Sequence, residues 1–286
     1  MTMTSTDFGV DLPTEPLRPV TAEEVAAFHR DGVVHLPGIL PLAWLDALAE
    51  PVERVVTTGE AVDLGGLADG GGGAKPAFAA GTDHWRTDPT FEAFSLASPL
   101  APIVATLLRS SSVWLWEDSV LVKEAGSPFA TRFHTDAGYF PLTGDQICTT
   151  WVPLDPATPE NGMLQWVRGS HLSGVDYRPN LFVTDEPLPG TDGDVVPDVG
   201  ADRTLSDRLI SFEVVPGDIT VHHYRTIHGA PANTTTDRRR RAISVRYCGD
   251  DARYLHKPGL PARHGLDQVA DGDPVGEPWY PRVWPR

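Results

Sequence analysis

Histidine and aspartate occur twice at a spacing of two residues, as His29 with Asp31 and as His134 with Asp136. Imidazole and carboxylate groups that converge on one point can bind a divalent metal ion. Residues two apart point to nearly opposite sides of a helix but to the same side of a strand. The first pair ends a predicted helix, whereas the second follows the extended run ATRF. We therefore predict that His134 and Asp136 share an ion and that His29 and Asp31 do not.

A third ligand is expected from His228 in the run RTIHGAP. We place it on the turn after the predicted strand DITVHHY, where Gly229 would let the backbone bend close to the ion. His222 and His223 are rivals, but adjacent strand residues face opposite sides, and their simplest interpretation is one core and one exposed histidine. Two imidazoles and one carboxylate leave three open sites, as in non-haem iron(II) oxygenases, and these sites can take a bidentate 2-oxo acid and dioxygen.

Such an oxo acid has a distal carboxylate that needs a fixed cation, and the run DRRRRAISVRY offers one. On a strand, Arg240, Ala242, Ser244 and Arg246 would share one face. An inward guanidinium can hold a carboxylate through two parallel hydrogen bonds. We interpret the preceding arginines, 238 and 239, as part of a solvated hairpin loop, which leaves Arg240 as the candidate.

The elements that must position these residues are mainly strands. Six runs rich in β-branched and aromatic residues are separated by Gly, Pro, Asn and Asp, which predicts a barrel or sandwich. They cover residues 113–124, 146–155, 161–167, 210–215, 218–224 and 241–247.

Helices are expected in front of this β region. Thr21 and Glu24 form a capping box that starts a short helix, and Gly32 ends it. A strand over 33–38 follows, then a helix through residues 42–52 that Pro51 should kink or shorten. A further helix should end near Arg109.

Four segments predict irregular structure within one domain over 1–286. We expect a loose arm over residues 1–18, and a flexible loop of the kind that forms lids in the Gly-rich stretch from about 64 to 82. The acidic insertion over 172–207 should lie on the surface or over a cavity mouth. The segment from about 255 onward should wrap the barrel, and we assign it no chemistry.

Charge and composition exclude some partners. The net charge of -16 disfavours nucleic acid and anionic membranes, since its field repels polyphosphate surfaces. The two cysteines are too few for a disulfide scaffold and suit a reducing cytosol. We find no apolar run near the ~20 residues of a membrane helix and no signal-peptide pattern at the start, so we expect a cytoplasmic protein. The sequence does not indicate an oligomeric state.

The sequence resembles the phytanoyl-CoA dioxygenase (PhyH) family of iron(II)- and 2-oxoglutarate-dependent oxygenases, whose relatives include ectoine hydroxylases. The resemblance runs from about residue 21 to 247 and beyond. Its motifs are EEVAAFHRDGVVHLPGIL, FHTDAGYF, WVPLDPATPENGMLQWVRGSH, and PGDITVHHYRTIHGAP followed by RRAIS. It implies a fold that is mainly β with flanking helices, a double-stranded β-helix or cupin-like jelly roll.

The resemblance also implies roles for single residues. Iron would be bound by His134, Asp136 and His228. Arg240 would bind 2-oxoglutarate, although it stands 12 residues after the distal histidine where the family often has 11. Trp151 matches a family tryptophan near the cosubstrate, and Thr149 shares its strand face; sheet core is an equally good interpretation of both. Ala230 stands where the family often has a serine that helps hold the oxo acid.

The implied reaction is an oxidation, with hydroxylation as the default, that converts 2-oxoglutarate and dioxygen to succinate and carbon dioxide. Desaturation, epimerisation or ring formation would follow from the same oxidation if the oxidised substrate reacted onward in another way. The alternatives are a metal-dependent hydrolase or cupin-like isomerase that uses no oxo acid, and a binding module without turnover. We expect a small-molecule substrate, such as a secondary metabolite, near the aromatic residues Trp116, Tyr139, Phe140 and Trp166, although aromatics on strands are more often core.

Overall fold

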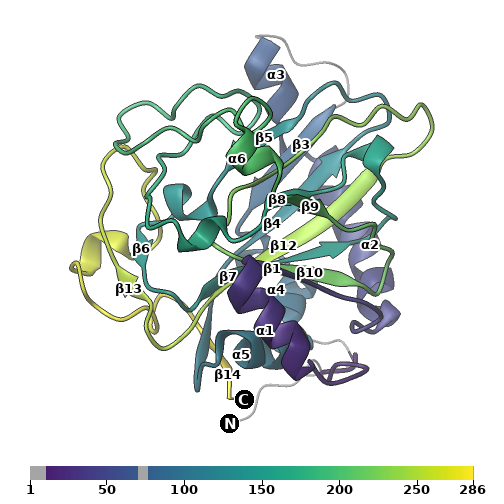
Figure 1. Ribbon diagram of the computed structural model, residues 1–286. Helices are drawn as coiled ribbons and strands as arrows, with labels where there is room; N and C mark the ends of the chain where they lie inside the picture. The colour runs from purple at the N-terminus through teal and green to yellow at the C-terminus, as the bar shows by residue number, and fades with distance from the viewer. Residues whose placement is uncertain (1–10, 70–76, 286) are drawn as a thin grey trace.

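The computed structural model describes residues 11–69 and 77–285, and antiparallel sheets dominate it (Figure 1). The strands are β1 (Val33–Leu36), β2 (Val62–Asp63), β3 (Phe78–Thr82), β4 (Val113–Lys123), β5 (Thr131–His134), β6 (Leu142–Thr143), β7 (Ile147–Pro153), β8 (Gln165–Val167), β9 (Leu209–Ser211), β10 (Ile219–His223), β11 (His228–Ala230), β12 (Arg240–Cys248), β13 (Arg253–Tyr254) and β14 (Arg282–Trp284). The larger sheet has the order β1-β10-β7-β12-β4-β3-β2, with β14 beside β4, and the smaller one β5-β11-β8-β9. Strands β13 and β6 form a separate pair.

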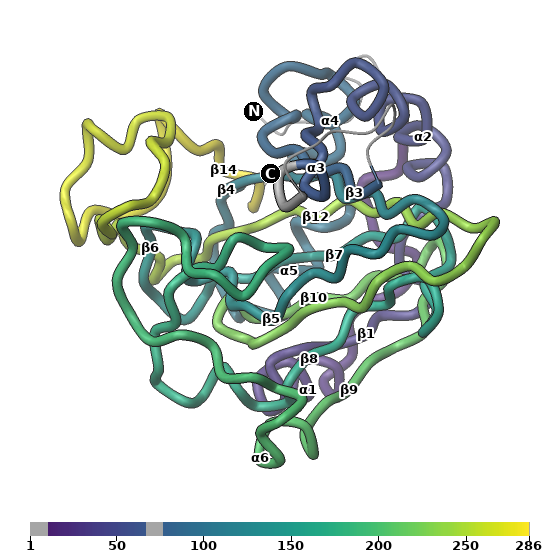
Figure 2. The backbone as a smooth tube through the Cα atoms, turned by 90° about the horizontal axis from the view of Figure 1, so that it is seen from above, coloured from purple at the N-terminus to yellow at the C-terminus, as the bar shows by residue number. Residues whose placement is uncertain are grey.

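The two sheets pack face to face around a small apolar cluster. Trp151 and Ala242 of the larger sheet meet Trp166 and Ala230 of the smaller one, and all four are buried. The view from above shows the strands of the smaller sheet running alongside β7 and β10 (Figure 2). The space between the sheets is therefore enclosed by β-structure on both sides.

Helices cover the other face of the larger sheet. They are α1 (Ala22–Asp31), α2 (Leu42–Thr57), α4 (Pro89–Ala97) and α5 (Leu100–Leu108), and the short helices α3 (Leu64–Asp69) and α6 (Arg203–Ser206) lie elsewhere. The main hydrophobic core lies between these four helices and the sheet, where Trp44, Phe94 and Val104 pack with Val120 and Val245. The core thus holds the sheet that supplies much of the site.

The predicted signals of the first helix are confirmed. Thr21 accepts a hydrogen bond from the Glu24 amide and the Glu24 side chain accepts one from the Thr21 amide, and Gly32 ends the helix at φ 79°. Helix α5 ends at Arg109, as expected. Pro51 does not shorten its helix, because α2 continues to Thr57.

Two segments are more ordered than predicted. The Gly-rich stretch from 64 to 82 was expected to be a loop, but it contains α3 and β3, and β3 pairs with both β2 and β4; residues 70–76 lie outside the described part. Of the predicted loose arm, residues 1–10 also lie outside it. The rest is tied down, since the Leu17 amide donates to Ile39 O at 2.9 Å and the Trp44 indole donates to Pro13 O at 2.7 Å.

The six predicted strand runs each contain a strand, although their bounds differ. Only the end of the run 161–167 is extended, as β8, because Asn161 ends a short 3-10 turn. The run 210–215 forms only the short strand β9, which begins one residue earlier. The acidic segment 172–207 contains α6 but no strand among the described elements.

Helices α4 and α5 also correct the expectation that no apolar run is long enough to cross a membrane. The stretch Pro89–Leu108 has 20 residues and a mean hydropathy of 1.5. Because 83% of it is buried inside the fold, and because Ser98 ends α4 within it, these helices are core elements.

Candidate functional site

Neighbouring strands of the smaller sheet place the two predicted imidazole ligands side by side. His228 lies on β11 directly opposite His134 on β5, and their ring centroids are 4.3 Å apart. Asp136 follows two residues after His134, at the start of the 3-10 turn Asp136–Tyr139. The extended backbone at Thr135 turns the Asp136 side chain to the same side as His134.

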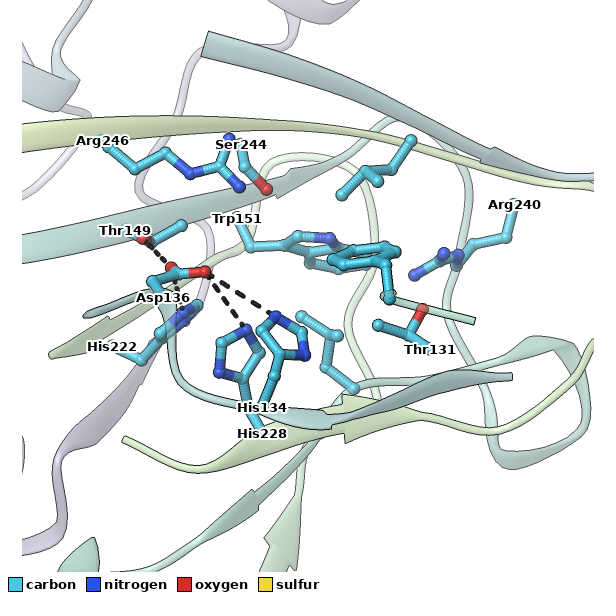
Figure 3. Close-up of a pocket in the computed structure, with 13 residues that line it drawn as sticks. Thr131, His134, Asp136, Thr149, Trp151, His222, His228, Arg240, Ser244 and Arg246 are labelled. Atoms are coloured by element: carbon cyan, nitrogen blue, oxygen red, sulfur yellow. Dashed lines mark hydrogen bonds and ion pairs between the residues drawn. The ribbon is translucent and has the colours of Figure 1, made fainter. Parts of the chain in front are cut away.

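The three side chains converge on one point (Figure 3). The Nε2 atoms of His134 and His228 each lie 3.8 Å from Asp136 Oδ1, and one ligand atom from each residue lies within 4.8 Å of the others. All three residues are buried. Two nitrogens and one oxygen at this spacing suit a divalent transition metal such as iron.

Backbone carbonyls fix the ring orientation of both histidines. Nδ1 of His134 lies 2.7 Å from Arg132 O, and Nδ1 of His228 lies 2.9 Å from Thr226 O. Each Nδ1–H can therefore donate to a carbonyl, which leaves the Nε2 lone pair free for a metal. Burial lowers the pKa of His134 to about 3 and that of His228 to about 4, so both rings are neutral, the form that binds metal.

The carboxylate of Asp136 is held through the oxygen that faces away from the two histidines. Its Oδ2 accepts a short hydrogen bond from the Thr149 hydroxyl of β7 and lies 3.3 Å from His222 Nε2 of β10, while Oδ1 faces the two histidines. Burial opposes ionisation, but the hydrogen bond from His222 and the charge of Arg246 outweigh it, so the pKa of Asp136 lies well below its usual value. Thr149 and His222 thus orient the carboxylate as outer partners of metal ligands commonly do.

A cavity of about 30 Å³ lies at these residues between the two sheets. Its lining includes every residue predicted for the site, namely His134, Asp136, Thr149, Trp151, His228 and Arg240. Leu121, Thr131, Leu164, Phe182, His222, Ser244 and Arg246 complete it.

Arg240 is fully buried at one end of this cavity (Figure 3). Its Nε and Nη1 have no hydrogen-bond partner among the described residues, and its guanidinium lies 5.4 Å from the Trp151 ring centroid. Burial lowers the pKa of Arg240 to about 10, so the group stays charged at neutral pH. A buried cation without a partner is costly, and the geometry of this end of the cavity suits a carboxylate.

The neighbouring arginines behave as strand alternation predicts. Arg241 points away from the cavity and pairs with Asp155 at 2.7 Å, whereas Ser244 and Arg246 line the cavity with Arg240. Arg239, expected in a solvated loop, is half-buried and pairs with Glu53 at 2.8 Å.

Three details of the sequence interpretation were wrong. His228 lies in strand β11, not on a turn. His223 is buried like His222, because its ring packs near Phe28 and its Nε2 lies 3.0 Å from Asp145 O. Gly229 serves strand packing rather than the ion, since a Cβ there would lie 2.9 Å from Thr131 O.

Sequence reasoning also missed cavity residues. Thr131 sits opposite Ala230 across β5 and β11, which no local pattern reveals. Phe182 reaches the cavity from the acidic segment, and its ring centroid lies 5.0 Å from that of His134. It adopts φ 67°, a genuine outlier for a bulky residue, which marks a constrained position.

The aromatic residues expected near the mouth divide into two groups. Trp166 is fully buried in the core between the sheets. Trp116 and Phe140 belong to a separate buried cluster beneath the C-terminal segment. Tyr139 lies against a predicted metal ligand, with its ring 5.5 Å from His134 and edge-on to it, and the Trp166 ring lies 6.1 Å from that of His222.

Comparison with known proteins gives this arrangement its context. The model of the phytanoyl-CoA dioxygenase (PhyH) family matches residues 28–242. A probable alpha-ketoglutarate-dependent hypophosphite dioxygenase of Stutzerimonas stutzeri is 29% identical over 139 residues, which is 45% of this chain and 42% of that protein. The match thus spans less than half the length of that curated relative.

Solved structures share the whole architecture. The carbocyclase SnoK from nogalamycin biosynthesis superposes with a TM-score of 0.71 at 24% identity and 99% coverage of both chains. The epimerase SnoN, in complex with Fe3+, alpha ketoglutarate and nogalamycin RO, gives 0.69 at 25% identity, covering 91% of this chain and 97% of that one. The predicted double-stranded β-helix is therefore confirmed. The chain belongs to the phytanoyl-CoA dioxygenase family of iron(II)- and 2-oxoglutarate-dependent oxygenases.

Proposed function

We propose that this chain is an iron(II)- and 2-oxoglutarate-dependent oxygenase that oxidises a small organic molecule and releases succinate and carbon dioxide. The observation that carries the proposal is the pairing of two features in one buried cavity. His134, Asp136 and His228 converge on one point, and Arg240 lies at one end of the cavity with two nitrogen atoms that have no partner among the described residues. A metal site alone would not need the arginine.

The protein's own groups would prepare both binding events. The neutral imidazoles and the ionised Asp136 hold the ion without first releasing protons. Arg240 binds and orients the distal carboxylate, and Trp151 packs against that guanidinium. When bound, iron(II) and 2-oxoglutarate would supply electrons that reduce and so activate dioxygen. The buried walls keep water away from this chemistry.

Thr131 supplies a hydroxyl that the motif lacks. Ala230 occupies the position where related sequences often carry a serine, and Thr131 is its direct partner on β5. The Thr131 side chain lines the cavity on the Arg240 side of the triad (Figure 3). We assign it the role of donating a hydrogen bond to the bound oxo acid.

The similar structures support a class of substrate but not a particular molecule. Neighbours described as a carbocyclase and an epimerase of nogalamycin biosynthesis support a secondary metabolite. Because these neighbours are described as a carbocyclase and an epimerase, they also support keeping ring formation and epimerisation as alternatives to hydroxylation. The net charge of -16 argues against an acyl-CoA, whose phosphates would need a basic groove.

A succinate-release screen tests the proposal. Iron(II), ascorbate and 2-oxoglutarate are supplied with a panel of small molecules, and His134→Ala serves as the metal-free control. We expect substrate-dependent succinate from the wild type and none from the variant. Absence of tight 2-oxoglutarate binding that depends on Arg240 would instead favour a hydrolase or isomerase that uses no oxo acid.

A further inference from the structure

A second guanidinium, that of Arg246, lines the same cavity, and the reaction outlined above gives it no ligand to bind. Arg246 lies on the same face of β12 as Arg240, six residues further along, which corresponds to about 20 Å of strand. Figure 3 shows the two arginines at opposite ends of the cavity, with Trp151 between them and Asp136 on the Arg246 side. Because the two side chains start this far apart on the strand, we assign the distal carboxylate of 2-oxoglutarate to Arg240 alone, whose Nε and Nη1 have no partner among the described residues.

Arg246 belongs to a buried cluster with an excess positive charge. Its Nη1 donates a short hydrogen bond to Ser119 Oγ and lies 3.5 Å from Glu117 Oε1. The other oxygen of Glu117 accepts a short hydrogen bond from Arg263 Nη2. Two guanidinium groups therefore share one carboxylate, and Nε of Arg246 has no partner among the described residues.

Nearby acidic groups do not cancel this charge. Asp118 is fully buried beside the cluster, and burial raises its pKa to about 8, so it is mostly protonated at neutral pH. Asp83 lies 3.7 Å from Arg86 and forms its own pair. Asp136 is engaged at Oδ2 by Thr149 and His222, with Oδ1 turned to the metal ligands. The cluster keeps a net charge near +1.

Aromatic rings of a separate buried cluster pack around Arg263, outside the residues that line the cavity. Arg263 lies 5.1 Å from the Trp116 ring centroid and 5.8 Å from that of Phe140. Tyr280 stacks on Trp116 with centroids 4.3 Å apart. The view from above shows the C-terminal segment looping beside β4 and β6 (Figure 2). An apolar, ring-bearing body in the cavity would instead meet Trp151 and Phe182, which belong to its lining.

Stability does not explain such a cluster. Buried Arg-Glu-Arg triads contribute little net stability, since desolvation offsets their attraction, and apolar replacements are often as stable. The cluster of Arg246, Glu117 and Arg263 nevertheless keeps an excess positive charge beside the predicted metal ligands, although the whole chain has a net charge of -16. Its free donor atom therefore points to a ligand.

We propose that Arg246, supported by Glu117 and Arg263, forms the substrate-recognition subsite and that the substrate is a ring-bearing carboxylic acid whose carboxylate binds Arg246. The guanidinium fork matches that group. The inference rests on the proposed oxygenase function, because it assigns Arg240 to 2-oxoglutarate and leaves Arg246 for the substrate.

Paired probes test the subsite. The protein is loaded with Ni(II), which does not turn over, and with 2-oxoglutarate. Calorimetry then measures the Kd of benzoate, phenylacetate and 1-naphthoate, each against its own primary amide. We expect at least one acid to bind about 10-fold or more tightly than its amide. Arg246→Met should abolish that preference while the Kd for 2-oxoglutarate changes by less than about two-fold, and Arg246→Lys should retain part of it.

Arg241→Met is the matched control, because it removes a guanidinium and an ion pair from the same strand but outside the cavity. It should leave the acid preference intact. Glu117→Gln should strengthen acid binding, which keeps the test decisive if Arg246→Met fails to fold. Equal binding of every acid and amide would overturn the proposal, as would an Arg246→Met variant that weakens 2-oxoglutarate and acid equally. Wild type that binds no 2-oxoglutarate would instead sink the oxygenase function, a distinct result.

Discussion

His134 and His228 are direct partners across two antiparallel strands, so a single backbone register sets the distance between two predicted metal ligands. Each ring is oriented by the backbone carbonyl two residues earlier in the sequence, that of Arg132 for His134 and that of Thr226 for His228. Strand pairing and backbone hydrogen bonds therefore orient both Nε2 atoms toward the same point.

Replacing His228 tests the metal site. His228→Ala should weaken Fe(II) binding by more than about 100-fold, since even residues that only support a ligand typically contribute about 10- to 100-fold. Anaerobic metal titration gives the measurement. His29→Ala is the control, because His29 belongs to the helical His-x-Asp pair and should bind no iron. Equal loss in both variants would contradict the assignment.

Removing the buried arginine tests the cosubstrate end. Arg240→Met should raise the Kd for 2-oxoglutarate in the metal-loaded protein by about 30-fold or more, since losing one partner of a buried charged pair costs about 2 kcal/mol or more. Arg239→Met is the control, because Arg239 pairs with Glu53 outside the cavity. A normal Kd in Arg240→Met would show that another cation holds the carboxylate.

The hydroxyl of Thr131 should contribute a smaller amount at the same end. Thr131→Val keeps the volume and the strand but removes one donor, so we expect an increase of about 5- to 10-fold in the Kd for 2-oxoglutarate, near the 1 kcal/mol of a typical hydrogen bond. Calorimetry checks this value. Ala230→Ser in the same background should restore part of the affinity from the partner strand; no change in either variant would remove Thr131 from the site.

Thr149 should act on the metal through Asp136. Thr149→Val removes the hydrogen bond to Oδ2 and should lower Fe(II) affinity by about 10-fold or more. Thr150→Val is closely matched, because Thr150 is also buried on β7 but donates to Val245 O on the other face. It should reduce stability without changing metal affinity. Identical metal affinities in the two variants would argue against a positioning role for Thr149.

The buried carboxyl of Asp118 gives a pH prediction. Burial raises its folded pKa to about 8, so the folded state keeps a proton that the unfolded chain releases near pH 4. Stability from this group is full at acidic pH and is lost as the pH rises through about 8. Asp118→Asn cannot ionise. The free energy of unfolding of the variant minus that of the wild type should therefore increase by about 1 kcal/mol as the pH is raised from about 7 to about 9.

Denaturant unfolding of the metal-free protein measures that difference. The comparison must be between variant and wild type, because burial lowers the pKa of Lys257 to about 8 and its titration has the opposite sign. Asp237→Asn, at an exposed position, should show no pH-dependent gain. A constant difference across the range would mean that Asp118 is ionised in the folded protein at neutral pH.

Local signals predicted what is local. The capping box at Thr21, the cap at Gly32 and the alternation that places Arg240 and Arg246 on one face each depend on a few adjacent residues. The grouping of His134, Asp136 and His228 was inferred by joining such local signals to motif resemblance. Their metal-binding roles stay predictions that the variants above address.

Long-range pairing explains what was missed. His222 reaches Asp136 only because β10 lies next to β7, and Thr131 faces Ala230 only through strand register. The Gly-rich stretch was predicted to be a loop because glycine has a low β-propensity. Pairing of β3 with β2 and β4 overrides that propensity. The Arg263 contact with Glu117 joins strand β4 to a segment that carries no pattern at all.

The ring of Phe182 has a thermodynamic consequence. The cavity beside it, about 30 Å³, has room for roughly one water molecule, far less than a five-carbon diacid needs. If the cavity walls separate to admit 2-oxoglutarate, the measured affinity is the intrinsic affinity reduced by the fraction of molecules in the open form. A smaller side chain in place of Phe182, which lines the cavity, should then increase the affinity for 2-oxoglutarate without adding a single contact to it.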